Sequence, residues 1–313
     1  MNPQTQSPLF SRLPAEIRNA IFSLVLQEFD IPDKPYPHDT YYTRYDVRAP
    51  QTVDLRLLRT CKRAYSEARG FVLSKSVALF YAGDIGRAPK GYPGYIQLGD
   101  AKVIYWGVLE QRRNKSFEAR HWERVKYAHI FIQLYAFSDP TFQYIFARET
   151  LRPGFKPKEV KITIRYTDWW YWEDNRTHVL ELDGRGGNQS RFLASGFPAS
   201  AERVVMEFET MEKKAAEVDA VVKKIVDTPE NWRFLRADGV VMVPKIAGEG
   251  EETVREWRWL GPTGFQVGTP GYKMKMARFD HHPKGHEMGY VVKVLTWVPG
   301  GHLSDTRAGE NGQ

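Results

Sequence analysis

Hydrophobic residues in the first quarter of the chain follow a helical period. Between residues 9 and 26, LFSRLPAEIRNAIFSLVL, one set of apolar side chains recurs at the i, i+4, i+7 and i+8 spacing of a single helical face: Ile17, Ile21, Leu24 and Val25. Pro14 suits the first turn of this helix, because its missing N–H is not needed there. Phe22 and Leu26 lie off this stripe, so the helix has apolar groups on more than one side and we expect it to pack against two neighbours.

A second helix is predicted from residue 53 to residue 73. Its apolar positions also recur at helical spacing and can close against the first helix: Leu58, Cys61, Tyr65, Ala68 and Val72. The intervening segment, residues 30–52, is rich in Pro, Tyr and Asp and is expected to be a loop. Residues 76–83, SVALFYAG, alternate in the manner of a short strand.

The second half of the chain changes to the two-residue period of strands. Four strands are predicted, at residues 124–137, 159–166, 202–210 and 239–244. Alternation assigns their inward side chains, among them Val160, Ile162, Ile164, Tyr166, Val204, Met206 and Phe208, and their outward ones, Lys161, Thr163 and Arg165. A helix is predicted at 211–227. Residues 272–279 and 290–299 are expected to pair as a hairpin across 280–289.

These elements predict an α+β or α/β protein. We expect an N-terminal helical head with a short strand (residues 1–83), an irregular linker (84–124), an α/β domain with a C-terminal β-hairpin (125–300) and a flexible tail (301–313). The strand starts are separated by roughly 35 to 45 residues, which is the period of strand–helix repeats. A leucine-rich-like repeat and an ordinary open α/β sheet both explain that spacing.

Composition restricts the class of protein. The chain has 313 residues, of which 42% are hydrophobic and 13% aromatic, enough for a substantial core. It has no apolar run long enough to cross a bilayer and no secretory signal, and its single cysteine forms no internal disulfide, so we expect a cytoplasmic or nuclear protein. The net charge is +7, but 45 basic residues face 38 acidic ones along most of the chain, so a solvated basic surface is favoured over a nucleic-acid interface.

The predicted first helix carries a family resemblance. FSRLPAEIRNAIFSLVL resembles the Leu-Pro-x-Glu-Ile start of F-box motifs, and specifically the F-box-like heads of a large family of fungal proteins. Residues 55–81 and 160–175 are similar to later segments of that family, as are residues 200–235. F-box segments dock on a Skp1-type adaptor and deliver a substrate-binding domain to a ubiquitin ligase. The residues that match the start of the motif are Leu13, Pro14, Ile17 and Ile21.

The chain departs from that family pattern in one place. The loop at 30–52 separates the two helices more widely than in a compact F-box. Two interpretations therefore stay open for the head: it docks on an adaptor, or its helix pair only packs against the sheet.

The stretch DWWYWEDN, which begins at Asp168, is a second candidate for partner binding. If the strand at 159–166 continues without a bulge, Trp169 and Tyr171 point outward, whereas Trp170 and Trp172 point inward. The inward placement of Asp168 indicates that the alternation breaks there. Exposed aromatic residues are typical interface anchors, and packing in the core is the alternative.

Signatures of catalysis are missing from the sequence. There is no G-x-S-x-G or phosphate-binding loop motif, and Cys61 lies on an apolar stripe, which is typical of an inert core thiol. The potential metal ligands near the C-terminus are Asp280, His281, His282, His286 and Glu287. Pro283 and Gly285 place them on a turn without the spacing of known zinc motifs, so we expect a solvated loop and no cofactor.

The sequence therefore favours a non-enzymatic protein-interaction protein. The resemblance implies an F-box-like substrate receptor with a Skp1-type adaptor and an unidentified protein substrate as partners. The alternatives are a nucleic-acid-associated protein that uses its basic surface, and a metal-dependent enzyme built around the histidine turn.

Overall fold

The computed structural model describes residues 4–37, 40, 43–83, 95–98, 101–106, 119–137, 142, 145–146, 154–170, 172, 180, 182, 194–248, 252–263 and 285–302. Within them the α-helices are α1 (Pro8–Ser11), α2 (Ala15–Val25), α3 (Lys62–Lys75), α5 (Ala119–Trp122), α6 (Leu134–Phe137) and α8 (Ala215–Asp227). The strands are β1 (Glu28–Asp30), β2 (Gln51–Val53), β3 (Val77–Gly83), β4 (Tyr95–Leu98), β5 (Ala101–Trp106), β6 (Tyr127–Ile132), β7 (Glu159–Ile164), β8 (Ala194–Phe197), β9 (Arg203–Met211), β10 (Phe234–Arg236), β11 (Val240–Pro244), β12 (Arg255–Pro262) and β13 (Glu287–His302).

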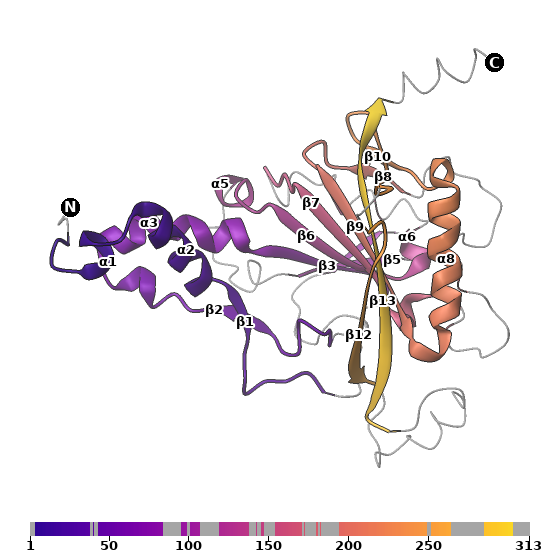
Figure 1. The fold of residues 1–313 in the computed structure, drawn as a ribbon, viewed down its shortest axis with the longest axis horizontal. Helices are drawn as coiled ribbons and strands as arrows, with labels where there is room; N and C mark the ends of the chain where they lie inside the picture. Colours follow the sequence, from indigo (N-terminus) through magenta and orange to yellow (C-terminus); the bar gives the residue numbers. More distant parts are fainter. Residues whose placement is uncertain are drawn as a thin grey trace.

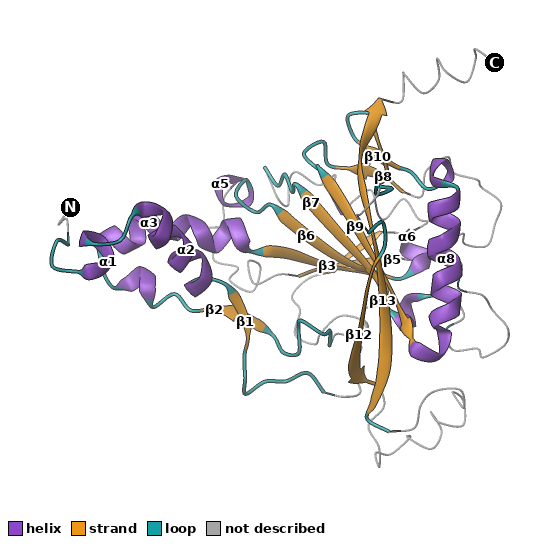
Figure 2. Ribbon diagram, viewed as in Figure 1, coloured by secondary structure: helices purple, strands orange, loops and turns teal. Residues whose placement is uncertain are grey.

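One large mixed sheet dominates the molecule (Figure 1). Its strand order is β4-β5-β3-β6-β7-β9-β13-β11-β10-β8, and β12 pairs with β13 beside β11. The central strands β3, β6, β7 and β9 are parallel, whereas β5 and β13 join them antiparallel on the two sides. The strands fan round from β3, which lies along the long axis of the molecule, to β13, which lies across it (Figure 2). The protein is thus a mixed α/β protein with few helices.

The first face of the sheet holds the main core. The inward sets of β7 and β9 are confirmed for six residues, which are fully buried in one cluster: Val160, Ile162, Ile164, Val204, Met206 and Phe208. Tyr166, also predicted to point inward, follows the end of β7 and is buried in a separate cluster. Helix α8 covers this face with the apolar stripe that its sequence predicts, and Val218, Val222 and Ile225 are buried against the strands. Every second side chain of a strand points to the same face of the sheet, so the two-residue period of apolar residues was enough to locate this core.

Helices α1, α2 and α3 lie at one end of the molecule with the small β1–β2 sheet, away from α8 (Figure 2). Strand β3, which we assigned to this head, leads directly from α3 into the middle of the large sheet, where it pairs with β5 and β6. The head therefore shares its last strand with the α/β part. None of the described helices has the length and apolar character needed to span a bilayer.

Several predictions need correction. The segment 84–124, expected to be irregular, contributes β4, β5 and α5. The order of the large sheet does not follow the chain, and β9 pairs antiparallel with β13, so the repeat interpretation is wrong. The segment 290–299, which we expected to pair with residues 272–279 in a hairpin, lies in β13. Strand β13 pairs instead with β12 on one edge and with β9 on the other. Residues 272–279 and most of the predicted tail lie outside the described part of the chain.

Candidate functional site

The apolar stripe of α2 faces solvent rather than the core. Ile17 is 49% exposed, Leu24 66% and Val25 45%, and Ile21 is half-buried. We expected α2 to pack against two neighbours, and within the described residues this stripe is not packed in the core. The buried side of the helix carries Phe22 and Leu26 instead.

The packing of α2 explains this orientation. Phe22 and Leu26 pack in one cluster with Val53 and with Ala68 of α3. The buried residues of α3 are the small Ala64 and Ala68, which allow the two helices to approach closely, whereas Tyr65, predicted to face α2, is 48% exposed. The sequence gives α2 two apolar sides, but within the described residues α3 and its flanks cover only one of them. The second side is left in solvent.

An ion-pair network fixes the start of α2. The guanidinium of Arg18 donates to the carbonyl of Leu13 at 2.8 Å and pairs with Glu67 of α3 at 2.8 Å. Arg63 donates to the same carboxylate at 2.9 Å. The hydrogen bond from Arg18 has the largest effect in lowering the pKa of Glu67, and the hydrogen bond from Arg63 lowers it further. Leu13 is half-buried and Pro14 is exposed at the N-cap, so these two motif residues lie at the start of the helix that carries the exposed stripe.

The aromatic stretch is built into the core. Strand β7 ends at Ile164, and a 3-10 turn (Tyr166–Asp168) follows, so the alternation breaks there as Asp168 indicated. Trp169 is only 2% exposed, and its indole N–H donates to the backbone carbonyl of Glu209 at 2.8 Å. Trp169 is therefore not an exposed anchor, which corrects our expectation. Trp172 is buried, as expected, and Tyr171 lies outside the described residues.

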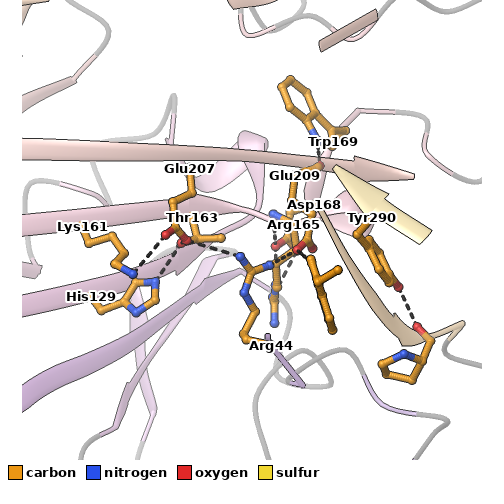
Figure 3. Close-up of polar contacts among 12 residues, drawn as sticks. Arg44, His129, Lys161, Thr163, Arg165, Asp168, Trp169, Glu207, Glu209 and Tyr290 are labelled. Carbon is orange, nitrogen blue, oxygen red and sulfur yellow. Dashed lines mark hydrogen bonds and ion pairs between the residues drawn. The ribbon is translucent and has the colours of Figure 1, made fainter. Parts of the chain in front are cut away.

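The second face of the sheet holds a buried charge cluster that the sequence pattern missed (Figure 3). We define it as Arg44, His129, Lys161, Thr163, Arg165, Asp168, Glu207 and Glu209. Arg44 comes from the loop between β1 and β2, is almost completely buried, and contacts both Glu207 (3.3 Å) and Glu209. Its guanidinium also lies 5.8 Å from the ring centre of Trp259, whose indole donates to Glu209 at 3.1 Å. The cluster thus ties the β1–β2 loop to strands β9 and β12.

Neighbouring strands extend the cluster toward β6. Lys161 pairs with Glu207 at 3.0 Å, and the hydroxyl of Thr163 donates to the same carboxylate at 2.7 Å. Burial opposes ionisation of Glu207, but the charges of Arg44 and Lys161 lower its pKa below the usual value. The ring of His129 lies 2.8 Å from the Thr163 hydroxyl, and burial, with the nearby cations, lowers the pKa of His129 well below its usual value. His129 is therefore neutral at neutral pH.

Arg165 and Asp168 complete the charge balance. Their side chains form a two-pronged ion pair with N–O distances of 2.6 and 3.1 Å, which closes the 3-10 turn after β7. Arg165 also lies over the ring of Phe131, 5.2 Å from its centre. Three cations thus face three carboxylates in the cluster. The hydroxyl of Thr163 and the three carboxylates are buried, and the contacts of the cluster join separate elements of the fold.

The histidine turn is only partly described. Asp280, His281 and His282 lie outside the described residues, and the backbone carbonyl of His286 accepts a hydrogen bond from the N–H of Thr263 at 2.9 Å. Elsewhere in the described part of the chain, no group of three or more His, Cys, Asp or Glu side chains is placed to hold a metal ion.

No protein-family model, curated protein or solved structure matches this chain. The exposed stripe of α2 is the feature on which we base a functional proposal, because large apolar side chains grouped on one exposed helix face are typical of protein interfaces.

Proposed function

We propose that this chain is a non-enzymatic protein-interaction protein whose head docks on a Skp1-type adaptor through α2. The observation that carries the proposal is the exposed stripe of Ile17, Leu24 and Val25, with Ile21 half-buried between them. A single exposed apolar side chain is ordinary on a protein surface, but a row at i, i+4, i+7 and i+8 is the pattern by which a helix packs into a partner's groove.

The start of the helix supports the same partner. Pro14 is exposed, and the carbonyl of Leu13 is held by Arg18, so the Leu-Pro-x-Glu-Ile residues lie on a fixed backbone at one end of the stripe. An interface that is ordered before binding loses less conformational entropy when the partner binds. In this proposal, the adaptor covers the side of α2 that α3 leaves uncovered.

The place of the head supports a receptor function for the rest of the chain. The head lies at one end of the molecule, and the large sheet extends away from it (Figure 1). A partner on α2 would leave most of the sheet region free for a second protein, which we propose to be the substrate of the ligase. Arg44 of the β1–β2 loop would hold the two parts in a fixed relation through its contacts with Glu207 and Glu209.

Affinity purification from cells of the native host tests the proposal. The tagged full chain should recover a Skp1-type adaptor together with a cullin, and the variant Leu24→Lys should recover neither. Asn19→Asp, an exposed position on another side of α2, is the matched control and should recover both. Recovery of neither protein by the unmodified chain, or equal recovery by Leu24→Lys, would count against the proposal.

A further inference from the structure

We propose that the head has a second docking site, a groove along α3 that binds an acidic segment of a partner protein. The groove has a volume of about 590 Å³. The residues that shape it are Leu58, Arg59, Cys61, Lys62, Tyr65 and Arg69. It lies on a different face of α3 from Ala64 and Ala68, which are buried on the side toward α2, so this inference does not depend on the α2 stripe.

The charge of the groove is uncompensated. Arg59, Lys62 and Arg69 are all exposed, and no carboxylate of the described residues forms an ion pair with any of them. The one acidic residue of α3 is Glu67, which is engaged by Arg18 and Arg63 instead. Three cations therefore border one hollow, and no carboxylate in the described part of the chain is paired with them. Such a surface attracts a ligand with several negative charges.

The groove also has apolar side chains, which favour a ligand with an apolar group. Tyr65 lines the groove and is 48% exposed, and the Arg69 guanidinium lies over its ring, 5.4 Å from the ring centre. Leu58 and Cys61 are half-buried beside it. A ring stacked on a guanidinium can accept an aromatic or aliphatic side chain, while the guanidinium nitrogens bind a carboxylate. The ligand that fits is a segment with several Asp or Glu residues around one large apolar residue.

A peptide fits this groove better than a nucleic acid does. Binding to a nucleic-acid backbone rests on many phosphate contacts along a continuous basic track. Here three cations cluster around one hollow with one exposed aromatic ring, and nearby Arg56 is paired with Asp54 at 2.5 Å. The groove therefore matches a short acidic segment.

Fluorescence anisotropy with the full chain tests this inference. The probe is a fluorescein-labelled peptide of glutamates around one phenylalanine, and the comparison peptide has glutamine at each glutamate position. We expect the acidic peptide to bind in the micromolar range and the glutamine peptide to bind at least about tenfold more weakly. Rising salt should weaken binding of the acidic peptide.

Two double charge reversals locate the binding. Lys62→Glu with Arg69→Glu should weaken binding at least about tenfold, and Lys62 is the first residue of α3, where a glutamate suits the helix dipole. The control is Lys75→Glu with Lys213→Glu, which makes the same change in net charge at exposed positions outside the groove and should leave affinity within about twofold. Tyr65→Ala, which changes no charge, should weaken binding several-fold, and thermal melting of every variant checks its folding.

Three results would overturn the inference: no binding of the acidic peptide to the unmodified chain, equal losses in the two double variants, or equal binding of the glutamine peptide. Tighter binding of a labelled single-stranded RNA than of the peptide, lost in the groove variant, would assign the groove to nucleic acid and also overturn it.

Discussion

Arg44 and Glu209 lie 165 residues apart in the sequence, yet their charged groups are in direct contact and both side chains are almost completely buried. Glu207 lies beside them, 3.3 Å from the same guanidinium. Arg44 belongs to the loop of the small β1–β2 sheet, and the two glutamates belong to the centre of the large sheet. This contact is therefore a principal connection between the head and the rest of the molecule.

Removing Arg44 should destabilise the protein strongly. Arg44→Ala leaves two buried carboxylates without their shared cation, and such losses cost about 3 to 5 kcal/mol. Arg48→Ala is the matched control, because Arg48 is exposed in the same loop, and it should change the free energy of unfolding by less than about 0.5 kcal/mol. The measurement is urea unfolding at pH 7. In the Arg44→Ala background, Glu209→Gln should restore part of the stability, and a further loss would contradict the ion-pair account.

The neutral, buried His129 should make the protein sensitive to mild acid. Burial lowers the pKa of His129 well below 6.5, so below pH 6.5 the unfolded chain binds a proton that the folded chain does not. Stability due to this group is fully present above pH 6.5 and falls as the pH decreases, by about 1.4 kcal/mol for each pH unit. Urea unfolding between pH 7.5 and pH 5.5 measures this slope.

His129→Gln should flatten that slope, since glutamine has no proton to gain in this range. The exposed His302 offers the control, and His302→Gln should leave the slope unchanged. A slope that is the same in the unmodified chain and in His129→Gln would show that His129 is not held neutral.

Glu28→Gln should stabilise the protein at neutral pH. Burial raises the pKa of Glu28 above 4.5, although a hydrogen bond with Ser76 opposes this. The folded state therefore retains the proton more strongly than the unfolded state, and stability falls as the pH rises above 4.5 toward the folded pKa. Glutamine removes this loss, so the variant should melt at a higher temperature than the unmodified chain at pH 7 and show no such advantage at pH 4. Glu16→Gln, at an exposed position, should show no such difference.

Trp169 should behave as a core residue. Trp169→Ala removes a buried indole and leaves the Glu209 carbonyl without its 2.8 Å donor, and we expect a loss of about 3 to 5 kcal/mol in the free energy of unfolding. Leu260→Ala is a useful comparison, because Leu260 is a large apolar residue that is exposed, and it should cost less than about 0.5 kcal/mol. Similar losses in the two variants would contradict the burial of Trp169.

The local period of the sequence was sufficient to predict much of the sheet. Strands β3, β7, β9 and β11 and helix α8 were located because their apolar residues alternate or recur on one face. The period does not show what covers the other face. In VVMEFET the pattern Glu207-x-Glu209 looks like a solvated face, yet a loop residue distant in sequence covers it. Nothing in the local sequence near Arg44 indicates that long-range pairing.

The same limit explains the error on α2. The sequence shows apolar residues on two sides of this helix, but burial of one side depends on what packs there. Phe22 and Leu26 pack in one cluster with the small Ala68 of α3. The stripe with Ile17, Leu24 and Val25 remained exposed to solvent. Partner binding by the motif residues stays a prediction; Pro14 and Ile17 are exposed, and Leu13 and Ile21 are half-buried.

The most direct test of the proposed docking surface is isothermal titration calorimetry of the purified chain with a Skp1-type adaptor. Ile17→Asp in the first turn and Leu24→Lys in the last turn place charges that suit the dipole of α2 at exposed positions. We predict that each variant melts within a few degrees of the unmodified chain and binds the adaptor at least about tenfold more weakly, as expected for the loss of an apolar anchor. Asn19→Asp should bind normally. Absence of adaptor binding by the unmodified chain, or unchanged affinity in both stripe variants, would contradict the account.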